Sequence, residues 1–466
     1  MVLPHNTHLD NPGAFSDSDP QLRVLKKQSL VYHSPLLEQM PRKEPGIYTL
    51  TGGRQTGKTT FLKQWMIQLI ESGVHPENIV YVTGELIDDH HSLIRIISEL
   101  VMEKPEFHMN FILLDEVTYI RNWDLGIKYL ADAGMLENVM LLITGSDLVI
   151  IKEARMRFPG RRGLSDKVDF HLWPLSFFEF VGLTEKIPQT DMALLSSLDD
   201  LPPSELLDPL FDLFNRYLFH GGFLTAINDM AIHGRILPAT FSTYSDWIRG
   251  DVLKRKKQEH YLFEVLEAIV KRYGTQVTWN SLSDDLSIDH PKTVSDYVSL
   301  LVSMDAAFVQ AALLEHKLSA SPKKARKIMF ADPFIFHAVR AWIKPCEDPF
   351  NQQVSPLLRD AEESAKLVEA CVATHYSRRF PTYYIKAKGE VDIAYVSQGT
   401  FWPIEVKWTG QLRPKQLKQI LKYKNGIIFT KSRHPGDIQG IPTMPLPLNQ
   451  ITLILLFLLQ FHLFPK

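Results

Sequence analysis

The run GGRQTGKTT combines glycines, a lysine and hydroxyl residues at a spacing that suits phosphate binding. Gly52 is followed after four residues by Gly57, Lys58 and Thr59, between the apolar run IYTL and a helical pattern. Glycines let the backbone curl so that N–H groups and the helix N-terminus surround phosphate oxygens, while the lysine reaches the β and γ oxygens. This spacing therefore predicts a site for ATP and Mg²⁺. The predicted nucleotide-binding residues are Gly52, Arg54, Gln55, Thr56, Gly57, Lys58, Thr59 and Thr60.

A second part of this site is predicted where the apolar run FILLDE ends in two carboxylates. Thr59 could ligate the Mg²⁺, Asp115 would hold it through water, and Glu116 would polarise the water that attacks the γ-phosphate. The next apolar run, VMLLITGS, brings Thr144 and Ser146 to the same edge of a parallel sheet, where open α/β folds bind ligands. One of these hydroxyls could position the attacking water or, alternatively, cap a helix.

Basic residues follow in the run ARMRFPGRRG. Arg161 or Arg162 could reach a γ-phosphate in a neighbouring subunit and neutralise charge in the transition state. A solvated surface position is the alternative, because a single sequence does not establish an oligomer.

A second group of charges stands near the other end of the sequence, in GEVDIAYV and IEVKW. Side chains two apart on a strand share a face, so Glu405 and Lys407 project together, and hairpin pairing would bring Asp392 to the same edge. Two converging carboxylates favour a divalent cation, and an adjacent ammonium can orient or deprotonate a metal-bound water. This set predicts metal-dependent hydrolysis of a phosphodiester, with a salt-bridged surface pair as the alternative.

The elements that must position these residues follow from periodicity. Short apolar runs alternate with helical stretches from residue 46 to about 180, which predicts a parallel sheet covered by helices on both faces. Helical spacing then dominates to about residue 250, and after three more helical patterns the runs AAFVQAALLE and ARKIMFAD indicate a hairpin. Helices followed by a hairpin favour a winged helix, and a second α/β unit follows it.

Charge patterns give weaker indications of partners. The pattern RPKQLKQILKYK predicts a basic helix that could follow a nucleic-acid backbone or simply be solvated. Its basic residues are Arg413, Lys415, Lys418, Lys422 and Lys424. The exposed side of the predicted helix over HPKTVSDYVSLLVSMDA is not markedly basic, which favours packing between domains over reading of the major groove.

The composition is that of a soluble globular chain. Of 466 residues, 45% are hydrophobic and 22% charged, and about 150 residues per domain predicts roughly three domains. The formal net charge of -2 gives no general attraction to nucleic acid or acidic membranes. With only Cys346 and Cys371, the chain has no disulfide framework and no CxxC motif, which fits a reducing compartment.

Neither end of the sequence has the pattern of a targeting or membrane segment. The start, MVLPHNTHLDNPGAF, lacks a basic region followed by an apolar run. A membrane-spanning helix needs about 20 apolar residues, and the apolar run Leu453–Leu459 is shorter than that. We expect a cytoplasmic protein whose tail is buried in the last domain or in a partner.

Several motifs occur together in an order that resembles a large family of prokaryotic AAA-type ATPases. They are GGRQTGKTT, LLDEVTYIRNWDLGIKYLADAG, LLITGS, PGRRG, WPLSFFEF and YLFHGGF. The resemblance implies a C-terminal winged helix and a PD-(D/E)xK, restriction-endonuclease-like domain, with Asp392, Glu405 and Lys407 as the triad and Glu369 as an additional acidic residue. Two departures stand at Thr118, where that family often has Gln, and at Leu224, where it often has Pro.

The predicted fold class is therefore α/β with several segments. They are an arm with a docking helix (1–45), an AAA-type P-loop domain (46–180), a helical lid or connector (181–250), a winged-helix-like domain (251–345) and a nuclease-like domain (355–466). We predict an ATPase that acts as a switch for a nucleic-acid-processing module. The alternative is an ATP-regulated binding protein whose nuclease-like fold is inactive and docks a protein partner or another subunit.

Overall fold

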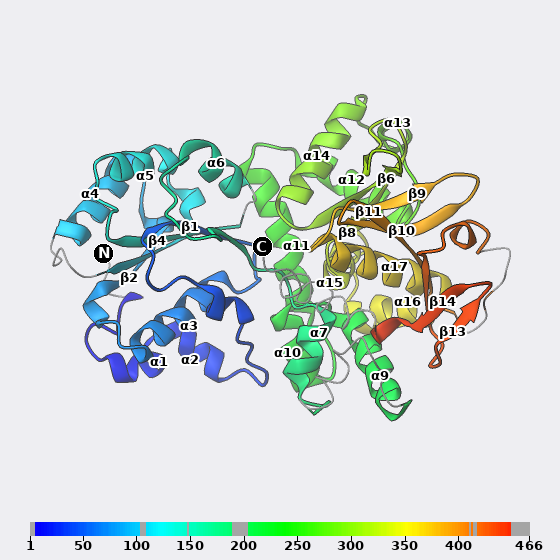
Figure 1. The fold of residues 1–466 in the computed structure, drawn as a ribbon, viewed down its shortest axis with the longest axis horizontal. Helices are drawn as coiled ribbons and strands as arrows, with labels where there is room; N and C mark the ends of the chain where they lie inside the picture. Colours follow the sequence, from blue (N-terminus) through cyan, green and yellow to red (C-terminus); the bar gives the residue numbers. More distant parts are fainter. Residues whose placement is uncertain are drawn as a thin grey trace. The chain divides into compact units, whose positions relative to one another are not determined.

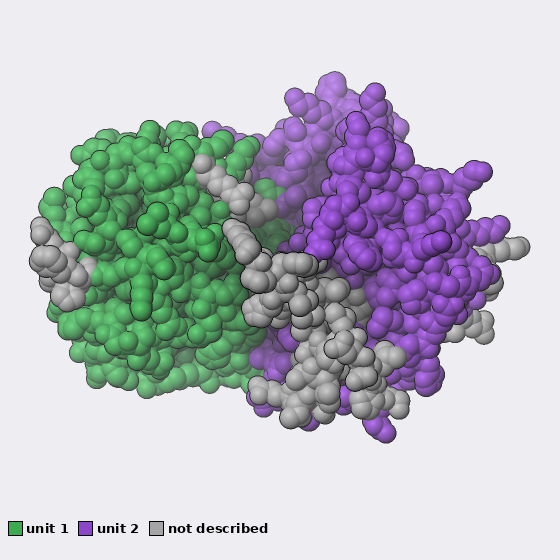
Figure 2. Space-filling view, viewed as in Figure 1, with its two compact units in different colours: residues 1–173, 303–305 green, residues 174–302, 306–466 purple. Residues whose placement is uncertain are grey.

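The computed structural model describes residues 5–102, 109–146, 149–188, 204–409, 412 and 417–448. The chain divides into two compact units, which Figure 2 shows in different colours. Unit 1 consists of residues 1–173 with 303–305, and unit 2 consists of residues 174–302 and 306–466.

Unit 1 is built on a five-stranded parallel sheet with the strand order β2-β3-β4-β1-β5, which confirms the predicted parallel sheet. Its strands are β1 (Gly46–Thr51), β2 (Ile79–Thr83), β3 (Asn110–Asp115), β4 (Val139–Gly145) and β5 (Asp169–His171). β1, β3 and β4 are buried along their whole length, as expected for strands covered on both faces.

Alternate residues of these strands belong to two separate hydrophobic cores, one on each face of the sheet. Tyr48 and Leu50 pack with α3 (Lys58–Glu71), whereas Ile47 packs on the opposite face with α5 (Trp123–Asp132). Figure 1 shows α4 (His90–Met102), α5 and α6 (Val149–Arg157) on one face of the sheet and α1 (Phe15–Ser18), α2 (Pro20–Lys26) and α3 on the other.

The described N-terminal residues pack tightly instead of forming the loose arm that their composition indicates. Phe15 and Leu22 belong to the core beneath α3, and the amide of Asn6 pairs with both backbone groups of Tyr81 on the edge strand β2, at 2.7 and 2.8 Å. Where the sequence predicts a short docking helix, the structure has a short 3-10 helix, η3 (Pro35–Gln39), with Leu37 buried. The contacts that hold residues 5–26 come from single side chains without helical periodicity, so the composition there indicates a loose arm.

Unit 2 surrounds a nine-stranded mixed sheet with the order β13-β14-β12-β11-β10-β9-β6-β7, in which β8 pairs with β6. The strands are β6 (Ala307–Leu314), β7 (Ser319–Ala320), β8 (Arg326–Phe330), β9 (Thr382–Lys386), β10 (Glu390–Ser397), β11 (Thr400–Lys407), β12 (Ile427–Thr430), β13 (Gly436–Ile438) and β14 (Ile441–Pro445).

Helices make up most of the remainder of unit 2. They are α7 (Phe177–Thr184), α9 (Ser204–His220), α10 (Leu224–His233), α11 (Pro238–Lys254), α12 (Glu259–Lys271), α13 (Trp279–Ser283), α14 (Pro291–Ser303), α15 (Pro333–Ile343), α16 (Ser355–Arg359) and α17 (Ala361–Ser377). In the part of the chain that the structure describes, no helix is both long and apolar enough to cross a membrane. Leu453–Leu459 lies outside that part.

The predicted hairpin exists, but it is part of a larger sheet. β6 and β8 pair antiparallel, and β6 also pairs in parallel with β9, from Ala311 with Tyr383 to Ala312 with Tyr384. The buried side chain of Gln310 strengthens this junction by donating to the carbonyls of Tyr383 and Asp392, both at 3.0 Å. The strands predicted for a winged helix therefore belong to the same sheet as those predicted for the nuclease-like domain.

The predicted basic helix is not present where the structure describes its residues. Between Leu417 and Gly426 there is only a 3-10 turn, η9 (Ile420–Lys422), and the side chains of Lys418 and Lys424 are exposed. Arg413 and Lys415 fall in the undescribed residues.

Paired glycines after α9 allow a close approach of backbone and carboxylate. Gly221 has φ of +55°, and a Cβ there would lie 1.7 Å from the Asp332 carboxylate. Asp332 accepts hydrogen bonds from the N–H groups of Gly222 and Phe334, each at 2.8 Å, and thus both caps α15 and fixes the end of α9. The prediction that these glycines end a helix is confirmed.

Two buried histidines predict how the stability of unit 2 depends on pH. His220 and His337 each hydrogen-bond a backbone carbonyl, and burial lowers both pKa values to about 4 from the ordinary 6.5. The unfolded chain therefore binds these protons more tightly. The free energy of unfolding therefore decreases as the pH falls from 6.5 toward 4. Each histidine accounts for a decrease of about 3 kcal/mol.

His337→Gln, which keeps a side-chain N–H donor, should make the free energy of unfolding less steep between pH 6.5 and 4. Urea titrations at several pH values would measure this slope. Burial raises the pKa of Asp332 to about 6, which acts in the opposite direction but equally in both proteins. Equal slopes for the two proteins would contradict the prediction.

Candidate functional site

The loop between β1 and α3 has the curled backbone that the glycine spacing predicts. Gln55 and Gly57 lie in the left-handed region, with φ of 62° and 93°. A Cβ on Gly52 would lie 2.3 Å from the carbonyl oxygen of Leu172, so only glycine fits there. The Thr56 hydroxyl closes the turn by donating to the carbonyl of Gly53 at 2.8 Å.

Lys58 lies over this loop, in the first turn of α3. Its ammonium donates to the carbonyls of Gly52 and Gly53 at 2.9 and 3.0 Å. Burial lowers the pKa of Lys58, while the carboxylates of Glu116 and Asp115 oppose that effect. The hydrogen bonds of this buried ammonium go to carbonyl oxygens, and it would gain from direct contact with the full negative charge that phosphate oxygens supply.

Asp115, at the end of β3, collects hydroxyl donors from three other elements. Thr59 and Tyr81 each donate to its Oδ2 at 2.7 Å, and Thr144 donates to its Oδ1. The carboxylate and the Thr59 hydroxyl, the two predicted magnesium ligands, are thus in direct contact. Oxygen donors of this type are those that Mg²⁺ prefers, so the residues present fit that ion.

Glu116 is held by neighbouring hydroxyl and N–H groups. Its backbone is left-handed, with φ of 53°, and its own N–H donates to the Thr144 hydroxyl at 2.9 Å. Its Oε1 accepts from the N–H and hydroxyl of Ser146, at 3.0 and 3.1 Å, and from the Thr118 hydroxyl at 3.2 Å. Thr144 and Ser146 therefore both contact the acidic pair. Thr118, one of the two departures noted in the sequence, donates to the Glu116 carboxylate and helps to orient it.

The structure also locates the other residues that the sequence predicts to bind the nucleotide. Arg54 donates to the Tyr119 hydroxyl at 3.4 Å, and Thr60 is half-buried in the first turn of α3. Arg161 pairs with Asp132, and Arg162 pairs with Asp169 at 2.6 Å.

Arg162 also donates to the carbonyl of Ile47 at 3.3 Å, so its side chain lies against the amino half of β1, whereas the phosphate loop follows the carboxyl end. Both arginines thus have partners inside unit 1. A role in a neighbouring subunit stays a prediction.

In unit 2, the hairpin of β10 and β11 brings the predicted triad together. Asp392 Oδ2 accepts from the N–H of Val406 at 2.8 Å and from the ammonium of Lys407 at 3.4 Å. The same ammonium lies 2.6 Å from Glu405 Oε1. Asp392 and Glu405 are 8% and 3% exposed, so these carboxylates are buried and do not form a surface pair.

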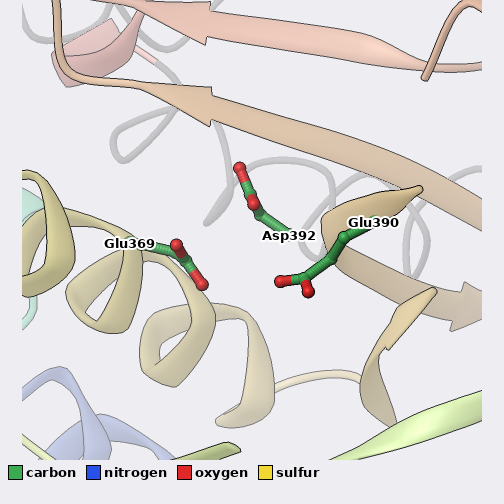
Figure 3. A group of neighbouring side chains, drawn as sticks. All are labelled: Glu369, Glu390 and Asp392. Atoms are coloured by element: carbon green, nitrogen blue, oxygen red, sulfur yellow. The ribbon is translucent and has the colours of Figure 1, made fainter. Parts of the chain in front are cut away.

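Two further carboxylates and one lysine extend this group into a larger charged cluster around the hairpin. Figure 3 shows Glu369 extending from α17 toward Glu390 and Asp392 on β10, and one carboxylate oxygen of each lies within 4.8 Å of the others. Lys327 of β8 pairs with Glu369 at 2.7 Å and with Glu390. Sequence reasoning missed Glu390 and Lys327, although a lysine inside the apolar run KIMF and an acidic residue two before Asp392 were available signals.

The four carboxylates outnumber the two lysines, which changes their proton affinity. Burial, with the charge of Asp392, raises the pKa of Glu405 to about 8. Burial raises the pKa of Glu369 to about 7, although Lys327 opposes this. Within the described chain, Glu405 Oε2 is buried without a hydrogen-bond partner, so the residues present fit a divalent cation that would accept this oxygen as a ligand.

Comparison with known proteins agrees with the geometry of unit 1. Residues 44–181 match the family described as AAA domain, and residues 211–345 match a domain of unknown function, DUF8612. An uncharacterised protein of Haemophilus influenzae is 25% identical over 268 residues, which cover 55% of this chain and 60% of that protein. An uncharacterised protein of Methanocaldococcus jannaschii is 28% identical over 261 residues, 51% of each chain. The match thus spans between half and two thirds of the length of these relatives.

Solved structures with a similar course of the chain have lower identities. The Walker-type ATPase PABY2304 of Pyrococcus abyssi is 13% identical, over 63% of this chain and 91% of that one, with a TM-score of 0.41. The ORC2 protein of Aeropyrum pernix in its ADP form is 14% identical, over 64% and 89%, with a TM-score of 0.34. The family match thus makes residues 44–181 similar to AAA domains.

Lys327→Met should destabilise unit 2 because it leaves the carboxylates of Glu369 and Glu390 without their shared cation. Breaking a buried ion pair costs about 3 kcal/mol or more, and Lys327 is 1% exposed. Urea unfolding at pH 7.5 would measure the loss, and Mn²⁺ should restore part of it by replacing the ammonium.

The matched control is Lys324→Met, because Lys324 is exposed and its ammonium donates to the carbonyl of Lys386 instead of pairing with a carboxylate of this cluster. It should change stability by less than about 0.5 kcal/mol. If the two variants were equally stable, the ion pairs of Lys327 would have no role in the fold.

Proposed function

We propose that unit 1 binds Mg·ATP and hydrolyses it. The contact of Thr59 with Asp115 beside the Lys58 loop carries this proposal, since a phosphate cradle and magnesium ligands meet at one sheet edge. On binding, the Lys58 ammonium would leave the two loop carbonyls and pair with the β and γ oxygens of the nucleotide. Thr59 and Asp115 would hold Mg²⁺, which would neutralise charge on the phosphates.

In this proposal Glu116 acts as the general base. Ser146 and Thr118 fix one carboxylate oxygen, and the other oxygen is then available to accept a proton from water. The water oxygen forms a bond to the γ-phosphorus while the bond from phosphorus to the bridging oxygen breaks, which yields ADP and inorganic phosphate. The proton passes to Glu116.

Glu116→Gln should bind Mg·ATP about as tightly as the native protein but hydrolyse it at least about 100-fold more slowly, because the amide cannot accept the proton. Lys58→Ala should lose most of its nucleotide affinity. Calorimetry would give the affinity, and phosphate release would give the rate.

Glu99→Gln, on an exposed position of α4, should behave as the native protein in both measurements. Undetectable affinity of the native protein for ATP and ADP with Mg²⁺ present would refute the proposal.

We further propose that the cluster of unit 2 hydrolyses phosphodiester bonds of nucleic acid, under control of the nucleotide state of unit 1. The buried contact of Asp392, Glu405 and Lys407 supports this, together with the unpaired Oε2 of Glu405 among the described residues. Asp392 and Glu405 would hold a divalent cation, which supplies an activated water. Lys407 would orient that water and stabilise charge on the phosphate.

The second candidate is an ATP-regulated binding protein. The ion pairs of Lys327 with Glu369 and Glu390 favour it, because an ammonium already compensates part of the acidic cluster. In that case the fold of unit 2 would dock a partner without cleaving nucleic acid.

Cleavage of labelled single-stranded DNA, duplex DNA and RNA distinguishes the two candidates. With Mn²⁺ or Mg²⁺, the native protein should cleave at least one of them, and Asp392→Ala or Lys407→Ala should lose at least about 100-fold in rate. Lys317→Ala, at an exposed position, should cleave normally. Intact nucleic acid under every combination of ATP and metal would reject the nuclease, and nucleotide-dependent capture of a protein would then support the binding role.

A further inference from the structure

Asp115 Oδ2 accepts hydrogen bonds from two hydroxyls that come from different parts of unit 1. Thr59 belongs to the nucleotide loop, whereas Tyr81 belongs to the edge strand β2, and both lie 2.7 Å from the same oxygen. Tyr81 is 4% exposed. A phenol is protonated at neutral pH, so its hydroxyl can act as the donor in this contact. Tyr81 thus helps to fix the carboxylate from an element outside the loop.

The N-terminal segment holds Tyr81 in turn. The amide of Asn6 bonds both the N–H and the carbonyl of Tyr81, at 2.7 and 2.8 Å. The ammonium of Lys63 lies 4.0 Å from the centre of the tyrosine ring. Lys63 itself donates to the carbonyl of His5 at 2.6 Å and pairs with Asp19 at 2.9 Å.

These contacts form a continuous path of buried groups. The side chains of Lys63 and Asp19 are each 2% exposed, so the charge on one requires the charge on the other. Oδ1 of Asp19 also caps α2 by accepting from Gln21 and Leu22. The ring of Tyr81 therefore has the Lys63 cation over its face and the Asp115 carboxylate at its hydroxyl, a polarising arrangement that strengthens donation to the carboxylate.

We propose that Tyr81 is a positioning residue for the magnesium ligand Asp115, and that residues 5–26 belong to the nucleotide site because they hold Tyr81. This inference rests on the proposed ATPase function. Without the phenol, Asp115 keeps its contacts with Thr59 and Thr144 but loses one of the two donors that fix its Oδ2. The ion would then meet a less ordered carboxylate, so affinity for Mg²⁺ falls while direct contacts with the nucleotide are unchanged.

Tyr81→Phe tests the proposal through the dependence of ATP hydrolysis on Mg²⁺ concentration. The concentration for half-maximal rate should rise about tenfold, as expected for loss of one hydrogen bond to a carboxylate. The affinity for ATP in the presence of EDTA should stay within about twofold, since Lys58 and the loop are untouched. A merely structural residue would lower stability without this separation of metal from nucleotide.

Tyr48→Phe is the matched control. Tyr48 is also buried on a strand of the same sheet, but its hydroxyl donates to the carbonyl of Glu44 at 3.0 Å. It should leave the Mg²⁺ dependence unchanged. Asp19→Asn, which keeps Oδ1 for the α2 cap but removes the charge facing Lys63, should raise the Mg²⁺ requirement several-fold with Tyr81 intact.

Asp19→Asn also decides the result if Tyr81→Phe folds poorly, as thermal unfolding would reveal. The proposal is overturned if Tyr81→Phe and Asp19→Asn both keep the native Mg²⁺ dependence, or if EDTA-resistant ATP affinity falls in parallel. Failure of the ATPase proposal is distinct, because the native protein itself would then show no Mg·ATP binding by calorimetry.

Discussion

Ionised groups that are removed from water need opposite charge or hydrogen bonds close by, and this requirement governs both candidate centres. In unit 1, Lys63 compensates Asp19, and three hydroxyls compensate Asp115. In unit 2, Lys327 lies between Glu369 and Glu390. In each centre, the strands and helices bring these compensating groups next to the buried charge. At Glu405, the buried Oε2 has no hydrogen-bond partner among the described residues, so a cation could supply the compensation that this oxygen needs.

The parts of the fold that sequence reasoning predicts are those encoded by neighbours in the chain. The phosphate loop, the buried strands of unit 1, the hairpin of β10 and β11, and α17 all arise from local spacing or periodicity. The residues that it misses act across long separations. Asn6 bonds Tyr81 over 75 positions, and Lys327 bonds Glu369 over 42. No local pattern encodes such a pair, because each member by itself resembles an ordinary polar side chain.

Continuity of the sheet in unit 2 also explains why domain boundaries are difficult to predict. The segment that matches a domain of unknown function, 211–345, includes β6 and β8. β6 pairs with β9, and β8 supplies Lys327 to the acidic cluster. The predicted boundary between residues 345 and 355 therefore separates residues that share one sheet and one charge cluster. The matched segment also contacts Asp392 itself, because Gln310 of β6 donates to the carbonyl of Asp392.

The lysine of the phosphate loop has a kinetic consequence. Because Lys58 donates to the carbonyls of Gly52 and Gly53, the loop maintains its own curvature through internal bonds. An arriving nucleotide has to exchange two hydrogen bonds but does not have to order a disordered segment, so little conformational entropy is lost at the encounter. Capture of nucleotide by such a preorganised loop is expected to be limited by diffusion and by the swing of one side chain, rather than by folding.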